Sequence, residues 1–137
     1  MKISTIVKLG VMMLVMLISM GTVSASGGAS YSTAEWIDVP DEDFDVWSGT
    51  CSSTGDWYKF DVNSGDDSYM DLQYIFTRYG GSMKLHDDYN GDIEAWVDST
   101  HSDHTADLQP SPQPRVQITR GTVSSYQFLL GRNTLPP

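Results

Sequence analysis

The sequence predicts an all-β protein: a jelly-roll-like antiparallel β-sandwich preceded by a signal peptide. Two observations favour the sandwich. Several short stretches after residue 35 alternate apolar and polar side chains with a period of two, and no long window has the 3.6-residue period of a helix. Turn residues divide these stretches into about seven short strands, as in sandwich domains.

The N-terminal stretch has the three parts of a secretory signal peptide. Lys2 and Lys8 give a basic start, residues 9–20 form an apolar run that is short for a bilayer span, and Val-Ser-Ala at 23–25 is a small-x-Ala cleavage site. Cleavage after residue 25 would release the protein, without a membrane span, into the periplasm or the medium. The alternative is an uncleaved membrane anchor.

Removing 25 of the 137 residues leaves 112, which suits one domain with its own core. We expect a flexible Gly- and Ser-rich leader over 26–34, the sandwich over 35–131 and a polar tail over 132–137. Without Lys2 and Lys8, six basic residues face 18 acidic ones, a net charge of −12. Such an acidic domain disfavours nucleic acid and anionic membrane surfaces as partners.

The strand expected at 57–62 has the clearest alternation. Tyr58, Phe60 and Val62 share one face, which should point into the core, while Lys59 and Asp61 share the other. Core positions on the later strands follow from the same pattern: Met70, Leu72, Tyr74, Phe76, Leu85, Val116, Ile118, Tyr126, Phe128 and Leu130, with Gln73 and Gln117 facing solvent.

The remaining elements follow in chain order. Short edge strands are expected at 36–39 and 44–50, and a strand is expected at 69–76. Strands at 83–86 and 93–97 flank Asn90-Gly91, the residue pair of a tight hairpin turn. Residues 98–114 contain three prolines and predict an irregular loop, after which strands at 115–118 and 126–130 close the domain around Gly121.

This order of signals resembles the bacterial pre-peptidase C-terminal domain, a jelly-roll-like β-sandwich appended to many secreted proteases. The matching residues are Asp56, Tyr58, Phe60, Val62 and Gly65 in the first strand and turn, Met83, Leu85, Asp87 or Asp88, Asn90 and Gly91 in the hairpin, and Tyr126, Phe128 and Leu130 in the last strand. The resemblance implies an accessory domain outside the cell. The proline-rich segment 109–114 departs from the family pattern, and no protease precedes the domain, so an accessory role would be played in trans.

No catalytic constellation is visible, so we expect a protein that is not an enzyme. The histidines His86, His101 and His104 lie in no nucleophile motif, and no local signature pairs Cys51 with one of them. As the single cysteine, Cys51 is either a small buried hydrophobe or a free thiol able to join two chains.

Two segments carry metal-ligand chemistry. Asp87, Asp88, Asn90 and Asp92 place hard oxygen ligands in one short turn, which makes calcium the candidate cofactor; the alternative is an ordinary acidic turn. His101, Asp103 and His104 are ligand types for a transition metal, although polar loops collect such residues without binding one.

Aromatic residues indicate a binding surface. The period of two places Trp57 and Trp96 opposite the core residues of their strands, and Tyr89 lies in the hairpin turn between them. Exposed aromatics of this kind bind peptides or sugars. The function expected is an exported binding or accessory module for a protein or polysaccharide surface. The alternatives are coverage of this face by the N-terminal segment, a structural cell-surface or assembly subunit, and a secreted hydrolase.

Overall fold

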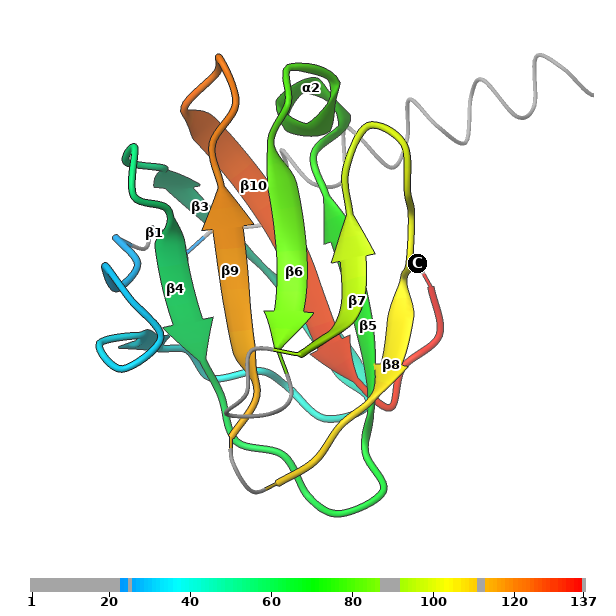
Figure 1. The fold of residues 1–137 in the computed structure, drawn as a ribbon. Coiled ribbons are helices and arrows are strands. Elements are labelled where there is room, and N and C mark those ends of the chain that lie inside the picture. The colour runs from blue at the N-terminus through cyan, green and yellow to red at the C-terminus, as the bar shows by residue number, and fades with distance from the viewer. Residues whose placement is uncertain (1–22, 25, 87–91, 111–112, 137) are drawn as a thin grey trace, which may run out of the picture.

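The computed structural model describes residues 23–24, 26–86, 92–110 and 113–136 (Figure 1). Most of the predicted signal peptide and the centre of the predicted calcium hairpin, residues 87–91, lie outside the described residues. Among the described residues, no helix has the length and apolar character needed to cross a membrane.

Two five-stranded sheets pack face to face as a β-sandwich, which confirms the predicted fold class. Sheet A has the strand order β1 (Val23–Ser24), β3 (Asp43–Thr50), β10 (Ser125–Arg132), β5 (Asp67–Leu72) and β8 (Thr105–Asp107). Sheet B has the order β2 (Glu35–Trp36), β4 (Asp56–Lys59), β9 (Arg115–Thr119), β6 (Ser82–His86) and β7 (Ile93–Val97). The pairs β1–β3 and β2–β4 are parallel and the other ladders are antiparallel.

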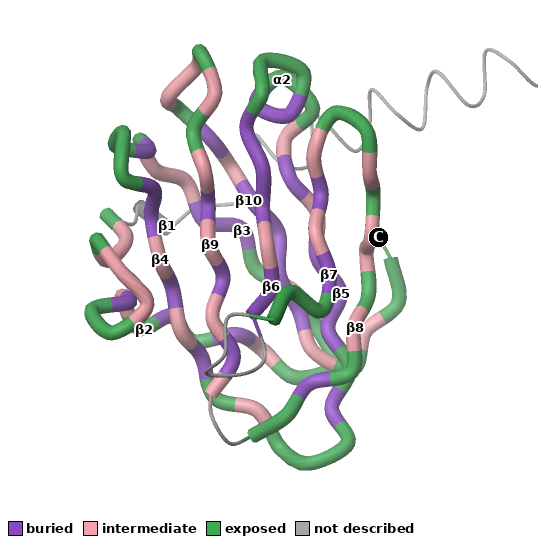
Figure 2. The backbone as a smooth tube through the Cα atoms, viewed as in Figure 1, coloured by how far each residue is buried: buried purple, intermediate pink, exposed green. Residues whose placement is uncertain are grey.

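The observed register places the predicted core between the sheets. Buried and half-buried positions alternate along β4 and β9 (Figure 2). The buried residues include Tyr58, Phe60, Met70, Leu72, Leu85, Val116, Ile118, Tyr126, Phe128 and Leu130, and the half-buried Val62 packs against them. Asp61 is exposed, and Lys59, Gln73 and Gln117 are half-buried on the outer side. The alternation therefore predicted the inward faces of β4, β6, β9 and β10, and of β5 up to Leu72, correctly.

The strand predicted at 69–76 is wrong in its second half. β5 ends at Leu72, and residues Tyr74–Arg78 form the short helix α2. The carbonyl of Gln73 accepts hydrogen bonds from the backbone N–H groups of Phe76 at 3.0 Å and Thr77 at 3.2 Å, which turns the chain out of the sheet. Phe76 is still buried, but Tyr74 is 68% exposed rather than in the core. A helical turn separates the two side chains that a strand would place on one face.

The loop predicted at 98–114 contains an additional strand. β8 pairs with β5, and the hydroxyl of Ser68 accepts a hydrogen bond from the backbone N–H of Ala106 at 3.1 Å. Leu108, which follows β8, is buried, and its N–H donates to the carbonyl of Asp66 at 2.8 Å. The prolines come after this strand, so they do not interrupt its ladder.

The expected flexible leader is held against sheet B. Gly28 and Trp57 exchange two backbone hydrogen bonds of 2.8 Å, and the carboxylate of Glu35 accepts the N–H of Gly27 at 2.6 Å. β1 lies just before the predicted cleavage site and pairs with Trp47 and Ser48. Cleavage after residue 25 would therefore leave β3 as the edge strand of sheet A.

Candidate functional site

The short helix α2 lies at one end of the sandwich (Figure 1) and belongs to an exposed apolar patch. Tyr74, Ile75 and Tyr79 are 68%, 50% and 47% exposed, within six consecutive residues. Phe76 and Thr77, from the same turn, are buried and anchor the patch to the core. We call α2, Tyr79 and the β9–β10 connection, residues 120–124, the tip.

Backbone contacts lock the two parts of the tip together. The carbonyl of Tyr79 accepts hydrogen bonds from the N–H of Thr122 at 2.9 Å and from its hydroxyl at 3.3 Å. Gly80 has φ +89°, a conformation that favours glycine, and a Cβ on Gly121 would lie 1.9 Å from the carbonyl oxygen of Tyr79. The exposed side chains therefore stand on a fixed backbone.

The tip is cationic although the protein is acidic. Residues 73–86 and 108–137 contain no Asp or Glu, and both exposed arginines, Arg78 and Arg120, lie at the tip. Other arginines bind within the domain: Arg115 packs over the ring of Tyr31, and Arg132 pairs with Asp66 at 2.6 Å. Positive charge is thus available to a partner at this end of the molecule.

The predicted aromatic face exists, but its rings contact other parts of the domain. The register aligns Trp57 and Trp96 in one row across the outer face of sheet B, through Gln117 and Lys84. Trp57 is half-buried against Tyr31, with ring centroids 5.8 Å apart, so the N-terminal segment covers part of this face, as in the alternative weighed above. Tyr89 lies outside the described residues.

The predicted transition-metal residues point toward different sheets. His101 stacks on Trp96 of sheet B with centroids 3.7 Å apart, and its Nε2 lies 2.7 Å from Oδ2 of Asp103. Nδ1 of His104 lies 3.0 Å from the carbonyl of Met70 in sheet A, to which it can only donate. In the described part of the chain, no three His, Cys, Asp or Glu residues form a group that could hold a metal ion. Of the proposed calcium ligands, only Asp92 is described, and it is exposed.

A polar cluster lies inside the sandwich at the same end as the tip. Asp56 accepts the hydroxyl of Tyr126 at 2.6 Å, and the hydroxyls of Tyr126 and Tyr58 are also hydrogen-bonded. Cys51 is buried, and its thiol donates to the carbonyl of Ile118 at 3.3 Å. Burial and the nearby Asp56 carboxylate raise the pKa of Cys51 to about 11, so the thiol is protonated at neutral pH and is not a nucleophile in that form.

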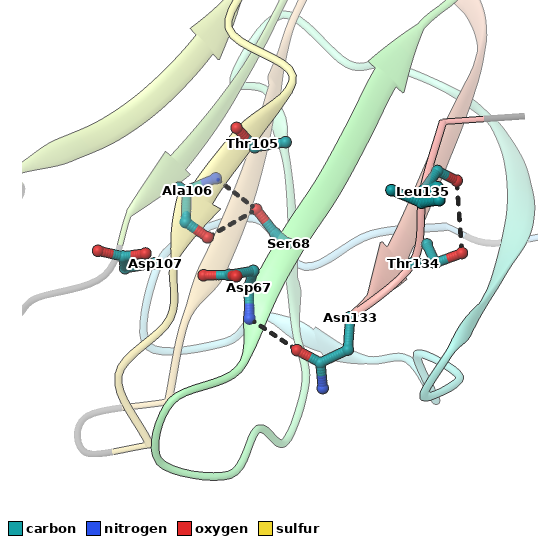
Figure 3. A pocket seen from close by; sticks show the side chains of 8 residues that line it. All are labelled: Asp67, Ser68, Thr105, Ala106, Asp107, Asn133, Thr134 and Leu135. Atoms are coloured by element: carbon teal, nitrogen blue, oxygen red, sulfur yellow. Dashed lines mark hydrogen bonds between the residues drawn. The ribbon is translucent and has the colours of Figure 1, made fainter.

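An open pocket of about 710 Å³ lies at the opposite end of sheet A (Figure 3). It is lined by Asp67, Ser68, Thr105, Ala106, Asp107, Asn133, Thr134 and Leu135. Asp67 and Asp107 are cross-strand partners, and the hydrogen bond with Asp107 raises the pKa of Asp67. The two ends of the molecule therefore differ in charge, with an acidic pocket at one end and a cationic tip at the other.

The missed residues are those of the tip. The two-residue alternation predicts a strand at Tyr74 and gives no signal for Ile75 or Tyr79. The pair Gly80-Gly81, which directly follows them, predicts a turn, but it lies too late in the chain to show that β5 ends at Leu72.

Taken together, fold and surface define a β-sandwich with an exposed aromatic tip. No protein-family model and no curated protein sequence matches the chain. The chain is similar in fold to the crystal structure of Salmonella Typhimurium PliG, a periplasmic lysozyme inhibitor of g-type lysozyme, with a TM-score of 0.54 and 13% sequence identity. The match covers 73% of this chain and 100% of PliG, and at this identity it shows the fold. The resemblance to the pre-peptidase C-terminal domain stays a prediction.

Proposed function

We propose that this chain is an exported, non-catalytic binding module that docks on an extracellular or periplasmic protein through its tip. The observation that carries the proposal is the exposure of Tyr74, Ile75 and Tyr79 beside Arg78 on a locked backbone. Tyr and Arg are enriched among the residues that dominate protein–protein binding energies, and a fixed backbone lowers the entropy cost of association.

Charge indicates the kind of partner. Arg78 and Arg120 would favour a partner surface that carries carboxylates, while the acidic remainder of the domain would repel an acidic protein in other orientations. An acidic groove on an otherwise basic protein satisfies both conditions. PliG shares the sandwich fold and is an inhibitor of g-type lysozyme, which supports a protein partner and makes that lysozyme the first one to test.

The test is calorimetric titration of the purified protein into g-type lysozyme, together with a cell-wall lysis assay. Tyr74→Ser and Tyr79→Ser should each weaken binding by roughly 30-fold, the effect of losing an anchor worth about 2 kcal/mol. Ile93→Ser and Leu135→Ser are matched controls, because both residues are exposed apolar side chains outside the tip. The controls should bind like the wild type.

Two results would contradict different parts of the proposal, the choice of partner and the role of the tip. If the wild-type protein does not bind, g-type lysozyme is not its partner. If the wild type binds and the tip variants bind equally well, the contact surface lies elsewhere on the domain.

A further inference from the structure

A second concave surface lies on the outer face of sheet A, beside the tip. This groove has a volume of about 420 Å³ and is lined by Ser48, Gly49, Thr50, Gln73, Ser125, Tyr126 and Gln127. Its volume falls within the range of small-molecule sites, about 300 to 1,000 Å³. The groove therefore has room for a small polar ligand.

The strand register builds the lining from two parallel rows. Thr50 pairs with Ser125, and Ser48 pairs with Gln127 in the next outward-facing row. The backbone N–H of Gln73 donates to the carbonyl of Gln127 at 3.0 Å, which extends the second row to a third segment of chain. Side chains two residues apart on a strand share a face, so Ser48 and Thr50 point outward together, as do Ser125 and Gln127. Gln73, just after β5, lines the same groove.

The chemistry of the lining is uniform. It consists of three hydroxyls and two carboxamides and contains no charged side chain, although the protein carries a net charge of −10. Tyr126 contributes no free hydroxyl to the groove, because its side chain is buried in the core and bonded to Asp56. Hydroxyls and carboxamides can each donate and accept hydrogen bonds, which suits a ligand with many neutral hydroxyl groups.

One atom of the lining lacks a protein partner. Oε1 of Gln127 is fully buried, and no described residue donates a hydrogen bond to it. A buried acceptor without a donor is unfavourable, and rotation of the half-buried Gln127 side chain toward the groove would bring this oxygen to a ligand hydroxyl.

We propose that this groove binds a neutral saccharide, with Gln127 and Gln73 as its principal hydrogen-bonding residues. The site is distinct from the protein-docking tip in chemistry, because it uses neutral polar groups instead of apolar and cationic ones. This ligand class is compatible with the exported module proposed above.

The experiment is an NMR titration of the purified protein with chitotriose and, separately, with maltotriose at millimolar concentrations. Binding should shift the backbone amide signals of Ser48, Gln73 and Gln127 in a saturable way. Gln127→Leu, which has a similar volume and no acceptor, should weaken binding about tenfold, the size expected for one lost hydrogen bond. Gln73→Leu is the second variant, and Gln113→Leu is the matched control because Gln113 lies outside the groove lining, just before β9.

Thermal melting separates a binding role from a structural one. Gln127→Leu should leave the melting temperature unchanged or raise it, since the buried acceptor it removes has no donor among the described residues. The proposal is overturned if neither oligosaccharide shifts the groove signals. It is equally overturned if the shifts persist in both glutamine variants, because the ligand would then bind elsewhere.

Discussion

Two buried aspartates at opposite ends of the sandwich have opposite electrostatic surroundings. Asp56 begins β4 near the tip, is 3% exposed, and has the hydroxyl of Tyr126 as its side-chain partner. Asp66 precedes β5 at the other end, is 7% exposed, and accepts hydrogen bonds from Arg132 at 2.6 Å and Asn133 at 2.9 Å. Burial is therefore similar at the two sites, and the donors differ.

The difference decides the direction of the pKa. Burial raises the pKa of Asp56, and the hydrogen bonds from Tyr126 and the Ser52 backbone offset it only in part. Burial also acts to raise the pKa of Asp66, but hydrogen bonds from Asn133, Asn63 and Arg132, with the charge of Arg132, hold it below the usual value. Burial acts in the same direction at both sites, so the cationic and amide donors decide whether the buried carboxylate has a lowered pKa.

The largest effect should come from removing the cation at the Asp66 site. Arg132→Met leaves a buried carboxylate without its ion-pair partner and also removes the hydrogen bond to the carbonyl of Val39. The free energy of unfolding should fall by about 3 to 5 kcal/mol, measured by urea denaturation at pH 7. Arg120→Met is the control, since this arginine is exposed and should cost less than about 0.5 kcal/mol. Equal losses in the two variants would show that the Asp66 pair does not stabilise the fold.

Removing the donor at the Asp56 site should have an intermediate effect. Tyr126→Phe deletes the hydroxyl that bonds both Asp56 and Tyr58 and should cost about 1 to 3 kcal/mol. Tyr58→Phe removes only the hydroxyl that is hydrogen-bonded to Tyr126, leaves the bond from Tyr126 to Asp56, and should cost less. If Tyr58→Phe is the more destabilising of the two variants, the hydrogen bond to Asp56 is not the main contribution of the Tyr126 hydroxyl.

The pH dependence of stability should separate the two carboxylates. The depressed pKa of Asp66 contributes stability that is present above the unfolded-state value of about 3.9 and is lost as pH falls through the folded pKa. The raised pKa of Asp56 has the opposite sign: its contribution is present below about 3.9 and is lost as pH rises through its folded pKa. Urea unfolding of Asp66→Asn across this range should therefore show a weaker acid-induced loss than the wild type. If Asp66→Asn loses as much stability at low pH as the wild type, Asp66 is not the cause of that loss.

Neutralising Asp56 should have the smallest effect at pH 7. Asp56→Asn keeps a carbonyl acceptor for the hydroxyl of Tyr126 and removes the cost of a desolvated charge, so stability should change by less than about 1 kcal/mol. The pH profile distinguishes this variant from the wild type. Stability should decrease less steeply above about pH 4 in Asp56→Asn than in the wild type. A large loss at pH 7 would mean that the ionised form of Asp56 is required for the fold.

Local alternation was sufficient to predict the inward faces of the strands but not the ends of the elements. Tyr58, Phe60, Ile118 and Phe128 are buried as predicted because a strand has a fixed period of two. Tyr74 follows the same alternation and is exposed, since the hydrogen bonds to Gln73 turn the chain into a helix. Period alone does not distinguish a strand that continues from one that ends and turns.

For the candidate site, too, the sequence predicted which way side chains face but not which contacts they make. Sequence alone predicted a binding role, which stays a prediction. It also placed Trp57 and Trp96 on the outer side of their strands, and the register confirms that placement. The sequence left open that the N-terminal segment covers this face, and the edge-on contact of Tyr31 with Trp57 shows such coverage. It did not indicate that His101 would stack on Trp96, because that contact depends on how the loop after β7 folds back. The exposed residues of the tip were found only in the folded chain.

The sequence by itself determined the all-β class, the acidic net charge, the inward faces of the strands and the shortage of catalytic motifs, because composition and a two-residue period are local properties. Only the tertiary structure decided which outward residues remain free, that Asp66 would meet Arg132 from a strand 66 residues away, and that Ser48, Gln73 and Gln127 would line one groove. These outcomes depend on which strands become neighbours, and pairing between distant strands is a property of the whole chain.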